Sequence, residues 1–82
     1  MTNDDQDVIA RIKELAHAEH GLFEKESRGE ASTQEREELK RIEVQLDQCY
    51  DLLRQRRARR AAGQDPDAAE VRPETVVEGY LG

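Results

Sequence analysis

The chain has 82 residues, of which 35% are hydrophobic and 39% are charged, with no Trp, one Phe and two Tyr. This length allows at most one small domain, and the composition favours helices that expose most of their circumference over a globule with a thick core. The 19 acidic and 13 basic residues give a formal net charge of −6, which argues against non-specific binding to nucleic acid because such binding requires neutralisation of phosphates.

Targeting and cysteine signals narrow the class of protein further. The N-terminal sequence Met1-Thr-Asn-Asp-Asp5 lacks the basic and then apolar layout of a secretory signal, and no apolar run approaches the roughly 20 residues that span a bilayer. We therefore expect a cytoplasmic protein that does not cross a membrane. A single cysteine, Cys49, excludes both an internal disulfide and a cysteine-rich zinc module.

Residues 4–27 are predicted to form the first helix. Its seam repeats at spacings of four, three, four and three residues, with one acidic residue inside it: Val8, Ile12, Leu15, Glu19 and Leu22. Ile9, Ala16 and Phe23 widen this stripe, which is typical of a helix that packs a broad apolar face against a core. The carboxylate of Glu19 needs a partner or an exit to solvent, and we interpret it as a residue that fixes register or oligomeric state.

Capping and turn signals define the ends of the helices. Asn3 or Asp4 can cap the first helix, and Gly29 supplies the permissive backbone that a helix C-terminus requires. Ser32 and Glu35 then form a capping-box pattern, in which each side chain bonds the backbone N–H of the other residue. The chain is therefore expected to turn at Gly29 and to begin a second helix at Ser32.

Residues 32–62 are predicted to form the second, longer helix, which Gly63 ends. Its apolar seam is narrow and regular, as in helices that pair along one edge: Leu39, Ile42, Leu46, Cys49 and Leu53. Cys49 is interpreted as a small buried hydrophobic residue, because reactive cysteines occupy partly exposed, electropositive settings.

A short connection makes the two helices antiparallel, so their register follows from matching the two seams. The numbers of facing residues then sum to 61, and the facing pairs are Leu22 with Leu39, Glu19 with Ile42, Leu15 with Leu46, Ile12 with Cys49, Val8 with Leu53, Asp5 with Arg56 and Asp4 with Arg57. Because the apolar seams and the terminal charges agree, the sequence predicts an all-α antiparallel hairpin over residues 1–63.

Residues 64–82 are predicted to form a C-terminal tail. Asp65 and Pro66 combine an N-cap with proline at the first helical position, which favours a short helix over residues 66–71. The last residues, which include Val76, Val77 and Tyr80, are too apolar for a solvated tail. We therefore interpret them as a docking segment that binds a partner.

An arginine cluster, Arg54, Arg56, Arg57, Arg59 and Arg60, is the most prominent candidate binding site. Cations at the C-terminus of a helix complement its dipole, and the acidic start of the first helix lies opposite in the predicted register, so part of this charge is expected to be compensated internally. We expect Arg54, Arg59 and Arg60 to remain available to an acidic protein surface. Nucleic acid is the weaker alternative, because no aromatic residue interleaves with the arginines.

Metal-binding and catalytic patterns are weak in this chain. Glu14 and His17 have the Glu-x-x-His spacing of di-metal bundles, but only Glu19 of this region points into the seam, while His20 lies on a flanking face. We therefore predict no metal and no other cofactor. No nucleophile triad or phosphate-binding loop is present, and a two-helix scaffold offers no deep cleft, so the sequence predicts a protein that is not an enzyme.

Three residues of the second helix, Val44, Tyr50 and Leu52, lie off its seam. Val44 and Leu52 have no reason to be apolar in a lone hairpin, so the three side chains are candidates for a face that buries against another chain. The sequence therefore predicts a homodimer, in which two hairpins form a four-helix bundle.

The segments 43–60, Gly63, Asp65-Pro66 and 72–80, together with Glu19-His20, resemble a family of short actinobacterial proteins that is defined only as a domain of unknown function. The resemblance covers nearly the whole chain, although family members more often carry Trp at the position of Tyr50. It implies a small cytoplasmic helical protein and supplies no activity.

The function predicted from these observations is protein–protein interaction, as a small adaptor or regulator. The alternative is a transcription-associated regulator. A slender hairpin with an acidic tip, here Glu24, Glu26, Glu30 and Glu35, is similar in outline to factors that insert a coiled coil into the secondary channel of RNA polymerase.

Overall fold

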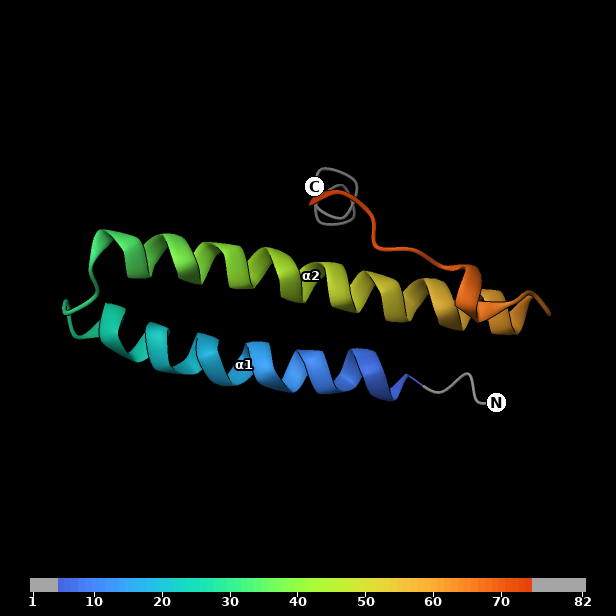
Figure 1. The fold of residues 1–82 in the computed structure, drawn as a ribbon, viewed down its shortest axis with the longest axis horizontal. Helices are drawn as coiled ribbons and strands as arrows, with labels where there is room; N and C mark the ends of the chain where they lie inside the picture. Colours follow the sequence, from blue (N-terminus) through green and yellow to red (C-terminus); the bar gives the residue numbers. More distant parts are fainter. Residues whose placement is uncertain (1–4, 75–82) are drawn as a thin grey trace.

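The computed structural model describes residues 5–74, which form two long helices and one short 3₁₀ helix: α1 (Gln6–Ser27), α2 (Thr33–Ala61) and η1 (Pro66–Ala68). The two long helices run antiparallel, side by side (Figure 1). Among residues 5–74 there is no strand. The predicted all-α hairpin is thus confirmed, and each end of the two helices lies within two residues of its predicted position.

The N-terminus of α1 differs from the prediction. Asp5, rather than Asn3 or Asp4, is the N-cap residue, and its side chain makes no capping hydrogen bond. The physical reason is that its carboxylate accepts hydrogen bonds from Arg56 and Arg60 of α2 instead. Asn3 and Asp4 lie outside the described residues.

The turn between the helices follows the predicted chemistry. Gly29 has a φ of 72°, in the left-handed region that glycine adopts without a steric penalty. The Ser32 hydroxyl accepts a hydrogen bond of 3.0 Å from the Glu35 backbone N–H, and the Glu35 carboxylate accepts one of 3.0 Å from the Ser32 N–H. This capping box, which is confirmed, fixes where α2 begins.

The core consists of two small clusters along the seam between α1 and α2. One contains Leu15, Ile42 and Leu46, and the other contains Val8, Leu52 and Ala69. Ile12 and Cys49, which were predicted to face each other, pack against both clusters and join them. The contact of Asp5 with Arg56 gives the same predicted register, in which the residue numbers sum to 61.

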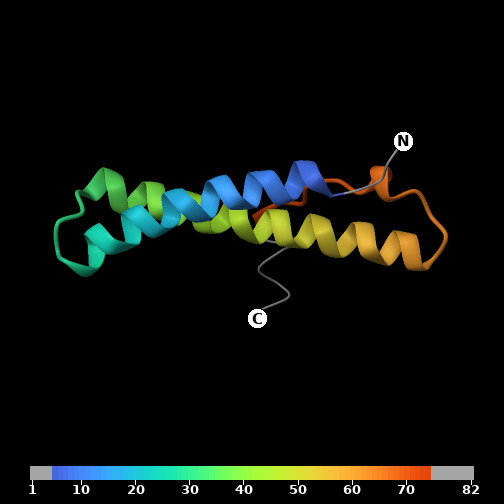
Figure 2. The ribbon, with the colours of Figure 1, turned by 90° about the horizontal axis from the view of Figure 1, so that it is seen from below.

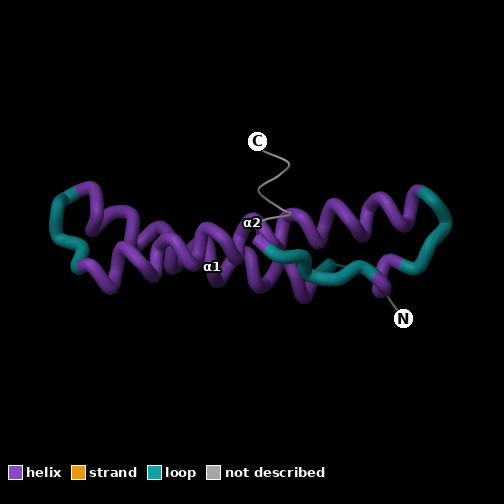
Figure 3. Tube along the Cα trace, turned by 90° about the horizontal axis from the view of Figure 1, so that it is seen from above, coloured by secondary structure: helices purple, strands orange, loops and turns teal. Residues whose placement is uncertain are grey.

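After α2 the chain reverses direction at Gly63, whose φ is 73°, and the C-terminal segment runs back along α2 (Figures 1 and 2). Figure 3 shows that most of the described part of this segment is loop. The predicted helix over residues 66–71 is too long, since the helical turn ends at Ala68 and Ala69 is already extended. Val76, Val77 and Tyr80, the predicted docking residues, lie outside the described part of the chain.

Candidate functional site

The arginine cluster at the end of α2 faces the acidic start of α1. Arg56 donates hydrogen bonds to Asp5, at 3.3 Å, and to Asp7, at 3.1 and 3.3 Å. Arg60 donates two more to Asp5, at 2.9 and 3.2 Å. The bonds from Arg60, and then the single bond from Arg56, lower the pKa of the Asp5 carboxyl group, while the two bonds from Arg56 lower the pKa of the Asp7 carboxyl group. Much of this cluster therefore holds the two helices together.

The predicted division of the arginines needs one correction. Arg60 was expected to be unmatched, but it reaches Asp5 because it lies one helical turn beyond Arg56 on the same face of α2. No ion pair joins Arg57 or Arg59 to another residue of the described range 5–74. Arg59 and the exposed Arg54 keep the role predicted for them, as candidates for contact with an acidic partner. Arg57 is a candidate too, and its predicted contact with Asp4 lies outside the described residues.

A second ion pair fixes the C-terminal segment to α2. The side chain of Asp51 is fully buried, and its carboxylate accepts two hydrogen bonds from the Arg72 guanidinium, one of them at 2.8 Å from Nε. The amide of Gln55 donates a further bond of 3.0 Å to the same carboxylate. The bonds from Arg72 and then Gln55 lower the pKa of the Asp51 carboxyl group, although burial acts in the opposite direction.

Two glutamine side chains of α2 bind the backbone of the same segment. Gln55 donates a bond of 2.7 Å to the Glu70 carbonyl, and Gln48 donates one of 3.2 Å to the Arg72 carbonyl. These bonds satisfy two backbone carbonyl groups that have no helical partner in the extended segment after Ala68. We call residues 66–72 together with these contacts the clasp.

The clasp changes the interpretation of Leu52. This residue was predicted to belong to a face that buries against another chain, but within the single chain it is only 9% exposed and packs with Val8 and Ala69. The expectation that a lone hairpin leaves Leu52 uncovered is therefore wrong, because the chain's own C-terminal segment covers it. Val44 is half-buried and Tyr50 is 49% exposed, so both keep their predicted role as candidates.

Three of the four carboxylates at the acidic hairpin tip contact neighbouring basic or histidine side chains. Glu24 contacts His20 and Arg28, Glu30 contacts Arg28, and the carboxylate of Glu35 accepts a bond of 2.6 Å from Lys25. The bond from Lys25 lowers the pKa of the Glu35 carboxyl group. None of the contacts described at the tip favours the polymerase-binding alternative.

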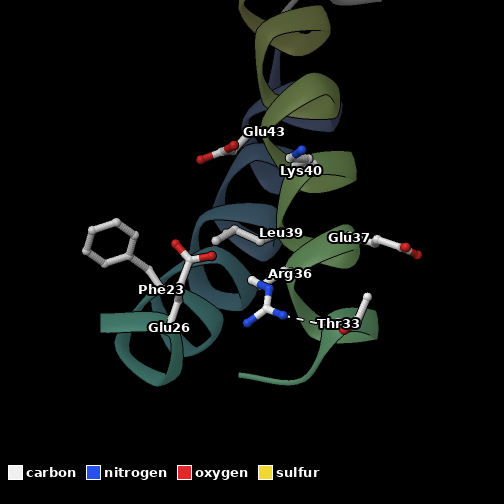
Figure 4. A pocket seen from close by; sticks show the side chains of 8 residues that line it. All are labelled: Phe23, Glu26, Thr33, Arg36, Glu37, Leu39, Lys40 and Glu43. Carbon is white, nitrogen blue, oxygen red and sulfur yellow. Dashed lines mark hydrogen bonds between the residues drawn. The ribbon is translucent and has the colours of Figure 1, made fainter. Parts of the chain in front are cut away.

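A groove opens between α1 and α2 close to the tip, and Figure 4 shows the side chains around it. Leu39 lies between the helices at its base, and the Phe23 ring lies on the side away from α2. Its rim carries charges of both signs: Glu26, Arg36, Glu37, Lys40 and Glu43. Arg36 also donates a weak bond of 3.4 Å to the Thr33 hydroxyl. The groove continues along α1 past His20, Glu19 and Ala16.

Two of the residues that widen the stripe of α1, Ala16 and Phe23, line this groove rather than the core, while Ile9 is half-buried. Phe23 is 56% exposed and Ala16 is also exposed, whereas both were expected to pack inward. The reason is that the single helix α2 covers only the seam of α1. Ile9, Ala16 and Phe23 are spaced seven residues apart, as are Arg36, Glu43 and Tyr50 on α2, so each set lies on one side of its helix. Ala16, Phe23 and Glu43 share one groove, so we define these six residues as the open face.

The polar residues considered as metal ligands are solvated or paired. Glu14 and His17 are exposed, Glu19 is half-buried beside the groove, and His20 contacts Glu24 at 2.8 Å. Within the part of the chain that the structure describes, no three His, Cys, Asp or Glu residues are grouped so that they could hold a metal ion. Cys49 is half-buried among apolar residues, and burial raises the pKa of its thiol, which suits a packing role.

Residues 4–82 match the sequence pattern of a protein family described as Protein of unknown function (DUF2630). The chain belongs to this family. Similar relatives are the uncharacterized proteins Rv0898c and MT0921.1 of Mycobacterium tuberculosis and Mb0922c of Mycobacterium bovis. Each is 48% identical over 79 residues, which cover 95% of this chain and 91% of the relative. No solved structure matches the chain.

The predicted resemblance to an actinobacterial family is thus confirmed. The family description names no activity, so a function for this member must come from its geometry. Neither helix in the described range is long and apolar enough to cross a membrane.

The clasp is the feature that sequence reasoning missed. Its signal is present in α2, because Gln48, Asp51 and Gln55 recur at spacings of three and four residues and form a polar stripe on one side of the helix. The two amides of this stripe can donate hydrogen bonds to the backbone carbonyls of an extended segment, and its carboxylate can pair with one cation. Arg72 is that cation, and the proline that follows it favours an extended backbone.

Proposed function

We propose that this protein is a non-enzymatic protein-interaction module, a small cytoplasmic adaptor or regulator that binds its partner through the open face. The observation that carries this proposal is the exposure of Phe23, which is 56% accessible beside a groove whose base is Leu39. Phe23 is the single phenylalanine of the chain. Aromatic side chains dominate the energetics of interfaces because each buries about 150–250 Å².

The ion pairs made by the candidate arginines and by Asp51 also favour an interaction module over an enzyme. Arg56 and Arg60 are engaged with Asp5 and Asp7, and the buried carboxylate of Asp51 is engaged with Arg72. These side chains stabilise the hairpin and its clasp, so they are poorly placed to act on a substrate. The non-enzymatic part of the proposal is supported by the exposure of Glu14 and His17, since catalytic groups usually lie in concave sites that bury the substrate.

The proposal includes the homodimer and four-helix bundle that the sequence predicts. Tyr50 belongs to the open face, whereas Val44 lines a separate shallow groove of α2 together with Lys40, Gln48 and Glu74. Both remain candidate contact residues, as do Arg57 and Arg59. For Val76, Val77 and Tyr80, the partner-binding role stays a prediction.

The test compares matched variants in capture from a native lysate. Phe23→Gln removes the aromatic side chain of the open face, and Val71→Gln removes an equally exposed apolar side chain, 61% accessible, from the C-terminal segment. We expect the wild type and Val71→Gln to retain the same proteins and Phe23→Gln to lose them at least about tenfold, a change of about 1.4 kcal/mol in binding free energy. Capture of the same proteins in the same amounts by all three baits would contradict the assignment of the open face.

A further inference from the structure

The open face has the properties of a surface that binds itself. We infer that its partner is a second copy of this chain, which packs the same face against it and so completes a four-helix bundle. This inference rests on the proposed function, because it names the occupant of the same surface.

The thickness of the molecule is the first argument. Its shortest extent is 15 Å, against 49 and 28 Å along the other axes, and a helix with its side chains is about 10–12 Å across. The two long helices therefore form a single layer that can bury one seam. The heptad-spaced residues Ile9, Ala16 and Phe23 flank that seam, and apolar residues at such flanking positions are characteristic of helices that pack against two neighbours in a bundle.

The surface area of the chain is the second argument. It exposes 5815 Å². A compact monomer of 9.4 kDa would expose about 5,000 Å², so the excess is about 800 Å². That is roughly the area each partner buries in a protein–protein interface of standard size. The excess is therefore large enough to supply one side of a standard dimer interface.

The charges around the groove are the third argument. A face that meets its own copy in a two-fold contact meets the same charges it carries, so a rim of one sign would repel itself. The rim here holds both signs: it has three acidic residues and two basic ones, namely Glu26, Glu37, Glu43, Arg36 and Lys40. A strongly acidic or strongly basic partner would match such a rim less well.

The position of the clasp is the fourth argument. The C-terminal segment binds the side of α2 that carries Gln48 and Gln55. Tyr50 follows Gln48 by two residues, so it points to nearly the opposite side of the helix, at about 200°. The described part of the C-terminal segment thus covers Leu52 and leaves the open face, with Phe23 and Tyr50, accessible to a second copy.

Sedimentation equilibrium of the full chain tests the inference. The wild type should have twice the 9.4 kDa mass of the chain. Phe23→Gln and Tyr50→Gln should each raise the dissociation constant of the dimer at least about tenfold, and the double variant should be monomeric. Val71→Gln, the matched control, should remain as dimeric as the wild type. Circular dichroism should show equal helix content in all four variants, because the replaced side chains are exposed.

A wild type that stays monomeric up to millimolar concentration would overturn the inference, and so would a dimer that the double variant does not weaken. The proposed function fails separately. If the chain is monomeric but Phe23→Gln still loses proteins captured from a lysate, the open face binds a different protein, so the interaction module stands and the second copy is wrong. If the dimer forms through the open face and no other protein is captured, self-association is the interaction that this face serves.

Discussion

Asp51 is the side chain on which the position of the C-terminal segment depends. Its carboxylate is fully buried, and water is replaced around it by the guanidinium of Arg72 and the amide of Gln55. Replacing one member of such a pair leaves a buried charge without its partner. The resulting loss of folding free energy is larger than the net contribution of the intact pair. The clasp is therefore more sensitive to single substitutions than the exposed pairs at the hairpin tip.

The first residue-scale prediction is that Arg72→Gln lowers the free energy of unfolding by about 2 kcal/mol, the range for hydrogen bonds to a charged group. Arg57→Gln serves as the control, since Arg57 is exposed and a surface change of this kind stays within about 0.5 kcal/mol. Urea unfolding followed by circular dichroism measures both. Equal stability of Arg72→Gln and the wild type would show that the ion pair contributes nothing to holding the segment.

A second residue-scale prediction concerns acid. Bonds from Arg72 lower the pKa of Asp51 below its ordinary value of 3.8, and bonds from arginines do the same for Asp5 and Asp7. A carboxyl group with a lowered folded-state pKa stabilises the fold fully above its unfolded pKa, and that stability is lost as the pH falls through the folded value. We expect thermal stability to be constant from pH 7 to about 5 and to fall below about pH 4.

The pH experiment has an internal control in Arg72→Gln. In that variant the carboxyl group of Asp51 keeps burial, which raises its pKa, but loses the arginine that lowers it. Its stability should therefore fall less steeply than that of the wild type between pH 4 and pH 2.5. A melting temperature of the wild type that rises on acidification would be opposite in sign to this expectation.

At the scale of elements, α1 and α2 are held by a seam that is one side chain wide. Leu46 is buried at the centre of one core cluster with Leu15 and Ile42. Val44, two residues earlier, is only half-buried and lies on the other side of α2. Leu46 and Val44 are therefore expected to contribute very differently to the stability of the hairpin, although they are only two residues apart.

The element-scale prediction is that Leu46→Ala costs about 2–5 kcal/mol, the usual range for a truncated core leucine, and removes much of the helix content at 37 °C. Val44→Ala should cost less than about 1.5 kcal/mol and leave the helix content unchanged. Circular dichroism and urea unfolding report both quantities. A loss of helix in Val44→Ala as large as that in Leu46→Ala would contradict the arrangement of the seam.

The helices, their register and the capping box could be predicted because their signals are local or periodic: heptad spacing places Leu15 opposite Leu46, and Ser32 lies three residues before Glu35. The clasp could not, because the contact of Arg72 with Asp51 depends on the reversal at Gly63 and on an extended path that many tails could take. The exposure of Phe23 was missed for a different reason. The periodicity of α1 identifies an apolar stripe wide enough to pack against two helices. It does not say whether both of those helices belong to the same chain.

At the scale of the whole molecule, the chain resembles half of a bundle. The C-terminal segment covers Leu52 on one side, and the open face with Phe23 and Tyr50 remains on the other. A two-helix layer with two small core clusters seldom supplies more than a few kcal/mol by itself. If a second copy completes the core, association adds to the stability of the folded hairpin, and the stability of the fold then depends on the concentration of the chain.

The whole-molecule prediction follows from that linkage. For a dimer, a hundredfold increase in protein concentration contributes about 2.7 kcal/mol per dimer, or about 1.4 kcal/mol per chain, to the folded state, which for a chain of this size raises the melting temperature by roughly 5–10 °C. Differential scanning calorimetry of the wild type between about 10 μM and 1 mM should show this rise. The Phe23→Gln, Tyr50→Gln double variant should melt at a lower temperature that does not change with concentration, while Val71→Gln should follow the wild type. A concentration-independent melting temperature of the wild type would mean that one hairpin with its clasp is a complete folding unit, and the exposed aromatic residues would then be left for a partner of another kind.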